Sequence, residues 1–232
     1  RNNDDANTAN TSVVTIGGRL FAMSEAGSAF ELEPEALDTI GPVTWRPDLQ
    51  ALPFSAHPLR DRDGSWWNFG ALSMLGGTGL LLWHIGADAR LIGADVLDLD
   101  TPGYLHAFVQ TDRHLVFLLM PYDTAPAGSF FESMTFAPER ACTVLVVDKA
   151  APDRVARRFE VDFTMAYHFG DAFERNGVIT VRVARHYDVD QARSPHRAAM
   201  AGHAGHASPA QLADLHLDMR SGRARWDMLG VT

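Results

Sequence analysis

Cysteine and lysine are almost missing from this sequence, and their scarcity excludes several kinds of site and partner. Cys142 is the only cysteine in 232 residues, so an intrachain disulfide and a cysteine metal cluster are excluded. Lys149 is the only lysine, the arginines are scattered, and the formal net charge is −9. Because contacts to phosphates need clustered basic side chains, we expect no nucleic-acid partner.

Long apolar runs and a signal peptide are also missing. The longest apolar stretches, such as residues 80–83 and 115–120, are far shorter than the roughly 20 residues that span a bilayer. The polar residues 1–5 do not resemble the start of a signal peptide. We therefore expect no transmembrane segment and a cytoplasmic location, while peripheral membrane contact stays open. A missing upstream part and a trimmed start explain Arg1 in place of Met equally well.

The sequence does contain many short apolar runs separated by Gly, Pro and Asp. Its hydrophobic content of 46% is enough for a real core. Runs rich in Val, Ile, Phe and Trp are typical of half-buried strands. The predicted strands are residues 13–16, 19–24, 30–32, 65–72, 79–85, 89–92, 114–120, 143–147, 156–163 and 178–184, with a hairpin of 215–219 and 223–228. Gly17-Gly18 and residues 33–38 are predicted turns.

Helical signal is sparse, which restricts the fold class. Ser208 as N-cap and Pro209 at the first helical position predict a helix start over residues 208–212. Residues 194–207 fit either a short helix or a surface loop. Short strands without intervening helices indicate an all-β sandwich, barrel or propeller. Residues 10–48 fit one four-stranded propeller blade, although the chain has no strict internal repeat.

Three of the ten histidines lie in apolar or aromatic sequence at regular intervals. His57, His106 and His168 are 49 and 62 residues apart, near the roughly 40–50 residues of one blade. In a propeller, one inward residue from each blade converges on the central axis, so these histidines could bind one metal. Neutral imidazoles suit iron(II), copper, zinc or nickel. The alternative is that each is a core or edge histidine bonded to a backbone carbonyl.

The other histidines carry weaker signals. His196, His203 and His206 resemble a local metal clip, but the absence of a nearby carboxylate or cysteine favours a solvated loop. Four more lie in or beside predicted strands without a spacing signal: His84, His114, His186 and His216. No hydrolase, phosphate-loop or zinc-protease motif occurs, and the glycine-rich residues 75–79 predict a hairpin turn.

An ordered series of phrases runs along nearly the whole chain, up to about Tyr187. The phrases are ANTSVV (9–14), GRLFAMSE (18–25), FELEPEALDT (30–39), FSAHP (54–58), NFG (68–70), LHAFVQT (105–111) and YHFGDAFE (167–174). In order and spacing they resemble the carotenoid cleavage oxygenase family. The resemblance implies part of a seven-bladed β-propeller with few short helices in loops. Residues 1–232 would form a single partial domain, with the N-terminal and C-terminal blades missing.

The resemblance also implies an axial iron ion, Fe(2+), held by four histidines. Three of them would be His57, His106 and His168, and Glu25 would accept the far N–H of a ligand histidine. A surface turn is the alternative role for Glu25. The fourth histidine and two further glutamates of the family fall beyond Thr232, so we expect the isolated chain not to complete the iron site.

Two positions beside the expected ligands depart from the family pattern. Ala107 and Asp171 replace the Asp and Asn that the family usually carries there. Both changes lie next to a ligand position, which puts the support of the site in doubt.

The reaction implied is the addition of both atoms of O2 across one conjugated C=C bond of a carotenoid or apocarotenoid, giving two carbonyl products. Four phenylalanines are candidate linings of an apolar substrate tunnel, or alternatively plain core: Phe54, Phe108, Phe169 and Phe173. Ser24 stands where the stilbene-cleaving branch commonly carries Lys, which favours a polyene substrate over a phenolic stilbene. A lignostilbene-type dioxygenase and a non-catalytic propeller used for binding or as a scaffold stay open as alternatives.

Overall fold

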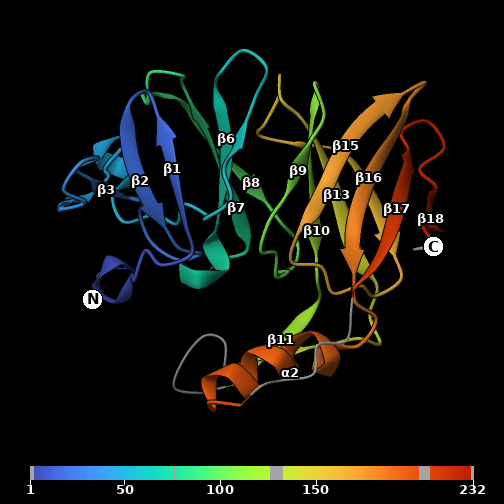
Figure 1. Ribbon diagram of the computed structural model, residues 1–232. Helices are drawn as coiled ribbons and strands as arrows, with labels where there is room; N and C mark the ends of the chain where they lie inside the picture. The colour runs from blue at the N-terminus through green and yellow to red at the C-terminus, as the bar shows by residue number, and fades with distance from the viewer. Residues whose placement is uncertain (1–2, 76, 126–132, 204–209, 231–232) are drawn as a thin grey trace. The chain divides into compact units, whose positions relative to one another are not determined.

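The computed structural model describes residues 3–75, 77–125, 133–203 and 210–230 (Figure 1). The chain divides into two compact units. The first comprises Arg1–Pro102 and Ala150–Arg154, and the second comprises Gly103–Lys149 and Val155–Thr232. The single partial domain expected from the sequence stays a prediction.

The first unit contains two four-stranded antiparallel sheets in which the strands follow chain order. The first sheet consists of β1 (Ser12–Ile16), β2 (Arg19–Met23), β3 (Phe30–Leu32) and β4 (Thr39–Pro42). The second consists of β5 (Leu59–Arg60), β6 (Trp66–Ala71), β7 (Gly79–Ile85) and β8 (Leu91–Asp98). Three short 3-10 helices accompany them: η1 (Asn3–Ala6), η2 (Pro47–Leu49) and η3 (Leu72–Leu75).

The second unit also contains two four-stranded antiparallel sheets. One consists of β9 (Val109–Gln110), β10 (His114–Leu119), β13 (Cys142–Asp148) and β14 (Val155–Val161), with the hairpin β11 (Tyr122–Thr124) and β12 (Met134–Phe136) inserted. The other consists of β15 (Phe169–Arg175), β16 (Val178–Arg185), β17 (Gln211–Asp218) and β18 (Ala224–Met228). Helix α2 (Val189–Met200) lies in the connection between β16 and β17 (Figure 1).

The all-β prediction is confirmed, and each four-stranded sheet has the consecutive antiparallel order of a propeller blade. Residues 10–48 contain the whole sheet β1 to β4, as predicted. Gly17 and Gly18 have φ angles of 57° and 80°, as the two-residue turn of a tight hairpin requires. The hairpin predicted near the C-terminus is also present, as β17 and β18.

The helix predicted over residues 208–212 is wrong for residues 210–212, which the structure describes. Gln211 begins β17 and pairs with Arg185 of β16. Ser208 and Pro209 lie outside the described residues. Ala213, Leu215 and Leu217 are buried at every second position. This alternation buries one face of a strand, and its packing outweighs the local capping signal.

Two other predicted boundaries need correction. The strand predicted at residues 89–92 begins only at Leu91, because Ala89 has a positive φ of 60° and belongs to the turn. Of residues 194–207, those up to Met200 lie in helix α2, while residues 204–207 lie outside the described part.

Aromatic side chains form the core of the first unit. The rings of Phe21, Trp45, Phe54 and Trp83 follow one another at centroid distances of 5.5–5.7 Å. Buried aromatic pairs in tilted arrangements contribute about 0.5–1.5 kcal/mol each beyond their area burial. The core therefore ties the first sheet and the segment before β5 to the central strand β7.

Cys142 is fully buried in the core of the second unit, and its thiol contacts the backbone of Thr164. Burial raises the pKa of the Cys142 thiol to about 11. At pH 7 only about one thiol in 10⁴ is then ionised, and the thiolate is the reactive form. We expect iodoacetamide to leave Cys142 unmodified in the native protein and to alkylate it within minutes in 6 M guanidinium. Rapid native labelling, followed by mass spectrometry, would contradict this burial.

Candidate metal centre

His57 lies at the end of a loop that the first unit holds firmly. The indole N–H of Trp83 donates to the carbonyl of Pro53 at 2.8 Å. The backbone N–H of Ser55 donates to the carbonyl of Phe69 at 2.8 Å. These bonds fasten the backbone immediately before His57, which is half-buried and is followed two residues later by β5.

Two more side chains complete the support of this loop. The fully buried amide of Asn68 donates to the Ser55 carbonyl at 2.7 Å. The hydroxyl of Ser12, at the start of β1, donates to the Ala56 carbonyl. Backbone carbonyls in a buried loop need such partners, and here they come from both sheets of the unit.

His106 occupies a similar position in the second unit, three residues before β9. Just before it, Tyr104 and Met120 form an isolated antiparallel bridge, with N–H···O distances of 2.9 and 2.8 Å in the two directions. The bridge attaches the backbone that carries His106 to the end of β10.

His168 directly precedes β15 and is held in the same way. Met165 and His186 form an isolated antiparallel bridge, with N–H···O distances of 3.0 and 2.9 Å. Each of the three histidines therefore lies at the entrance to the first strand of its sheet, which is β5, β9 or β15.

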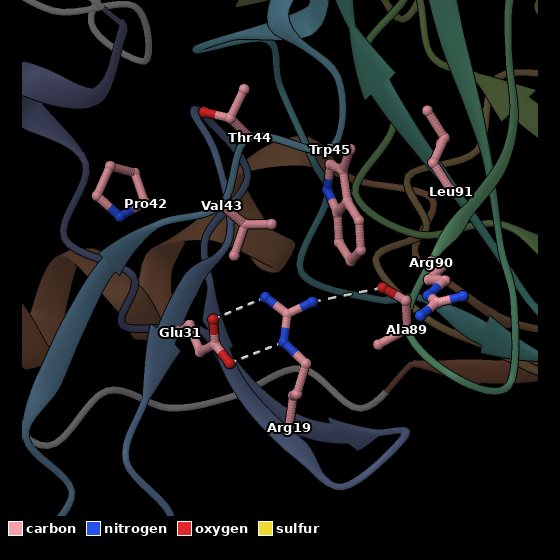
Figure 2. Close-up of a pocket in the computed structure, with 9 residues that line it drawn as sticks. All are labelled: Arg19, Glu31, Pro42, Val43, Thr44, Trp45, Ala89, Arg90 and Leu91. Atoms are coloured by element: carbon pink, nitrogen blue, oxygen red, sulfur yellow. Dashed lines mark hydrogen bonds and ion pairs between the residues drawn. The ribbon is translucent and has the colours of Figure 1, made fainter.

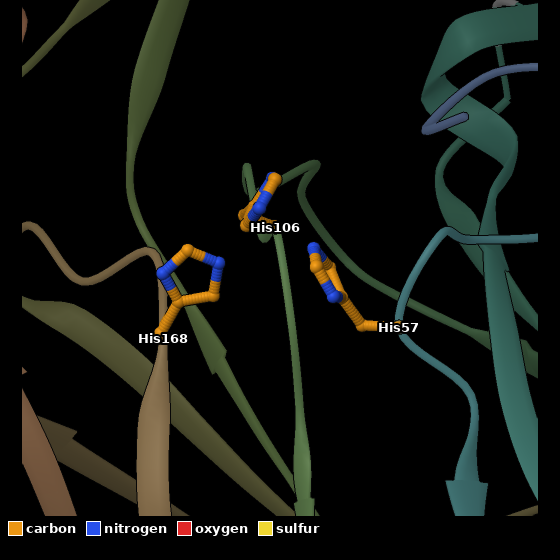
Figure 3. Close-up of side chains that lie close together, drawn as sticks. All are labelled: His57, His106 and His168. Carbon is orange, nitrogen blue, oxygen red and sulfur yellow. The ribbon is translucent and has the colours of Figure 1, made fainter. Parts of the chain in front are cut away.

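The second unit brings His106 and His168 together. Their ring centroids are 5.0 Å apart at an interplanar angle of 80°, and each offers a ligand nitrogen within 4.8 Å of the other's (Figure 3). The Tyr167 ring meets His106 edge-on at 5.7 Å. Removal from water and the neighbouring His106 lower the pKa of His168. A lowered pKa favours the neutral imidazole, which is the form that binds metals.

This pair fits a divalent first-row metal. Two imidazoles suit iron(II), copper or zinc equally well on chemistry alone. His57 belongs to the first unit. Its binding of the same ion as His106 and His168 stays a prediction.

Glu25 lies half-buried in the loop between β2 and β3.

The two residues that depart from the family pattern, Ala107 and Asp171, differ in burial. Ala107 is buried beside His106, whereas Asp171 is exposed on β15. The small side chain of Ala107 cannot supply the hydrogen bonds of an Asp at that position, so any such support of His106 has to come from elsewhere.

The four candidate tunnel phenylalanines differ in burial. Phe54 belongs to the aromatic core of the first unit, and Phe108 stacks on Phe117 at 5.3 Å in the second. Both have the packing of core side chains. Phe169 is half-buried and Phe173 is 54% exposed. A tunnel lined by these residues stays a prediction.

Sequence reasoning missed a pair formed by a buried histidine and a glutamate. Nδ1 of His114, which is only 4% exposed, lies 2.9 Å from Oε2 of Glu174 and connects β10 with β15. No local pattern announces this pair, because 60 residues separate its members.

Two further histidines outside the candidate centre, His84 and His216, have side-chain partners. His84 stacks on Trp67 at 4.0 Å and contacts the Ser65 hydroxyl at 3.0 Å. His216 lies between Thr180 and Asp227, at 2.9 and 3.0 Å. Of the predicted local clip, His203 is exposed, whereas the side chain of His196 and all of His206 lie outside the described residues.

A separate pocket of about 480 Å³ opens on the first unit (Figure 2). Its lining residues are Arg19, Glu31, Pro42, Val43, Thr44, Trp45, Ala89, Arg90 and Leu91. Arg19 and Glu31 form a bidentate pair with two N···O distances of 2.7 Å. This hydrogen bonding lowers the pKa of the Glu31 carboxyl. None of the residues expected to bind metal or substrate lines this pocket.

Among the residues that the structure describes, no helix has the length and apolar character needed to cross a membrane.

Comparison with known proteins identifies the family. The sequence profile described as "Retinal pigment epithelial membrane protein" matches residues 1–229. The apocarotenoid-15,15'-oxygenase of Synechocystis is 29% identical over 192 residues, which cover 75% of this chain and 38% of that protein. The resveratrol cleavage oxygenase 1 of Aspergillus fumigatus is 30% identical over 172 residues, covering 72% and 34%.

The fold comparison agrees with the sequence comparison. The crystal structure of the cobalt-substituted Synechocystis ACO superposes with a TM-score of 0.81 at 23% identity, covering 95% of this chain and 48% of that one. In the sequence alignments, the chain spans less than two-fifths of the length of the Synechocystis and Aspergillus proteins. The resemblance read from the sequence is confirmed: this chain belongs to the retinal pigment epithelial membrane protein (RPE65) family, the family of the carotenoid cleavage oxygenases.

Proposed function

We propose that the protein carrying this chain is a non-haem iron(II) dioxygenase that cleaves one conjugated C=C bond of a carotenoid or apocarotenoid. Both atoms of O2 enter the products, which are two carbonyl compounds. The observation that carries the proposal is the pair His106 and His168, set edge to face at the entrances to β9 and β15 in a chain of this family. Membership of a family with enzymatic relatives supports the reaction class.

The proposed iron site includes His57 as a third ligand. Its support comes from its position, because His57 precedes β5 as His106 precedes β9 and His168 precedes β15. The four consecutive antiparallel sheets are in keeping with blades of a seven-bladed propeller. Any further blades and ligands would come from other parts of the whole protein.

The side chains of this chain would hold and orient the ion. When bound, iron(II) supplies an open coordination position at which O2 can react. His57, His106 and His168 would donate imidazole nitrogen atoms, and the lowered pKa of His168 favours its neutral, metal-binding form. Glu25 accepts the far N–H of a ligand histidine, which sets the tautomer and the direction of the ring.

For the substrate we propose an apolar polyene rather than a phenolic stilbene. Ser24, beside Glu25, has its hydroxyl oxygen 2.7 Å from Asn7 Oδ1 and 2.7 Å from the Ala26 carbonyl. This hydroxyl is engaged within its own loop, so Ser24 does not present a charged or free polar group for a phenol. The stilbene alternative is favoured by one observation, the similarity to a resveratrol cleavage oxygenase.

The test is made on the whole protein, purified and loaded with iron(II). We expect about one iron per protein and conversion of an apocarotenoid to two carbonyl products, with one ¹⁸O atom in each when ¹⁸O2 is used. Resveratrol serves as the competing substrate. Cleavage of resveratrol alone would reverse the substrate choice, and a protein that binds no metal would favour the non-catalytic scaffold.

A further inference from the structure

The loop that carries Glu25 is bound at one end by side chains from the N-terminal segment. The N–H, the carbonyl and the hydroxyl of the buried Ser28 are all hydrogen-bonded to this segment. Its N–H and hydroxyl donate to the two carboxylate oxygens of Asp4, at 2.7 and 3.0 Å. Its carbonyl accepts from the side-chain amide of Asn7 at 2.7 Å. Bonds to a carboxylate are among the stronger hydrogen bonds in proteins.

The same segment also binds the other end of the loop. Asn7 Oδ1 lies 2.7 Å from the hydroxyl oxygen of Ser24 and accepts the N–H of Ala9 at 3.0 Å. Glu25 follows Ser24 directly, so Asn7 contacts both the residue before Glu25 and, through Ser28, the end of its loop.

Gly27 allows this close approach. It has a φ of 88°, and a Cβ built on it would lie 2.5 Å from Asn7 Nδ2 and 2.7 Å from Asp4 Oδ1. Its carbonyl also accepts the N–H of Phe54 at 2.8 Å. Phe54 begins the short run that ends at His57, so the Glu25 loop and the His57 loop are directly hydrogen-bonded within the first unit.

We propose that Asp4 and Asn7 are positioning residues for the metal centre, acting through the loop of residues 24–28 that carries Glu25. The proposal rests on the proposed function, in which Glu25 supports a ligand histidine. A carboxylate can orient an imidazole only if its own backbone is fixed. The N-terminal segment holds this loop at both ends, through the side chain of Ser24 and the backbone of Ser28. The hydrogen bond from the Phe54 N–H to the Gly27 carbonyl extends the same support towards His57.

The test measures cobalt(II) affinity in the whole protein, by titration followed through the visible absorption of the bound ion. We expect Glu25→Gln to weaken binding by about 10–100-fold, as is usual for residues behind metal ligands. Asn7→Ala is expected to weaken binding by about tenfold when Glu25 is present and by less than about twofold in the Glu25→Gln background. Thr8→Ala, an exposed change in the same segment, serves as the matched control.

A second measurement needs no metal. In the metal-free protein we expect the backbone amide of Ser28 to exchange its hydrogen about tenfold faster after Asp4→Ala, since it loses its acceptor. Asp4→Asn keeps an acceptor oxygen. The exchange rate of the Ser28 amide and the cobalt affinity are therefore both expected to lie close to those of the unmodified protein.

The outcomes separate the two proposals. If Glu25→Gln weakens cobalt binding and Asn7→Ala does not, the positioning role is wrong while the role of Glu25 stands. Equal effects of Asn7→Ala in both backgrounds would likewise overturn it, because they would reveal a general loss of stability. If Glu25→Gln leaves the affinity unchanged, the proposed role of Glu25 fails, and the positioning role fails with it.

Discussion

Replacing His106 or His168 with alanine is expected to lower the iron(II) affinity of the whole protein by more than about 100-fold and to abolish dioxygenase turnover. Residues that merely support a ligand already cost about 10–100-fold when changed, so loss of a direct ligand should exceed that range. The centroids of the two rings lie 5.0 Å apart within the second unit. The measurement is iron content after dialysis, with turnover on the same samples.

The same experiment tests His57 and the alternative local clip. His57→Ala is expected to match the other two variants in iron loss, which would place all three histidines at one ion. The control is His203→Ala, an exposed histidine that should retain full iron content and activity. Iron loss in the control, together with normal iron in His57→Ala, would show that our proposal assigns the metal to the wrong group of histidines.

The second large effect is expected from Gly70→Ala in β6. A Cβ at this position would lie 1.9 Å from the Pro53 carbonyl oxygen and 2.7 Å from its carbonyl carbon, so backbone has to move. Overpacking commonly costs about 1–3 kcal/mol, and a backbone neighbour leaves no flexible side chain to yield. We expect a loss of about 3 kcal/mol in unfolding free energy for the first unit, together with a displaced His57 loop and weaker iron binding.

Gly93→Ala, in β8 of the same sheet, is the matched control. Its Cβ would meet only Asp95 Oδ2, at 3.6 Å, which is ordinary contact. Urea unfolding followed by tryptophan fluorescence suits the comparison, because four of the five tryptophans belong to the first unit. A Gly70→Ala protein as stable as Gly93→Ala would show that the Pro53 loop is not held against β6 as described.

Local sequence patterns were sufficient to predict those structural elements that depend on neighbouring residues in the chain. Gly17-Gly18 predicts a tight hairpin because glycine adopts positive φ angles at no steric cost, and both angles are observed. Alternating or continuous apolar runs located β6, β7, β10, β13 and β16 to within two residues. The failure at residues 208–212 has the opposite cause. There the pairing of β17 with β16, a tertiary interaction, overrides a favourable local cap.

By itself, the sequence determined the all-β class, the candidate ligands and the family, because strand periodicity and the order of short phrases are encoded along the chain. Only the tertiary structure decided which side chains meet. The contact between His106 and His168, the His114–Glu174 pair and the binding of the Glu25 loop by Asp4 and Asn7 join residues 17 to 62 positions apart. The blade-like interval between His106 and His168 allowed the first contact to be predicted. The other two depend on which distant strands and loops come together in space, and no local pattern in this sequence specifies that.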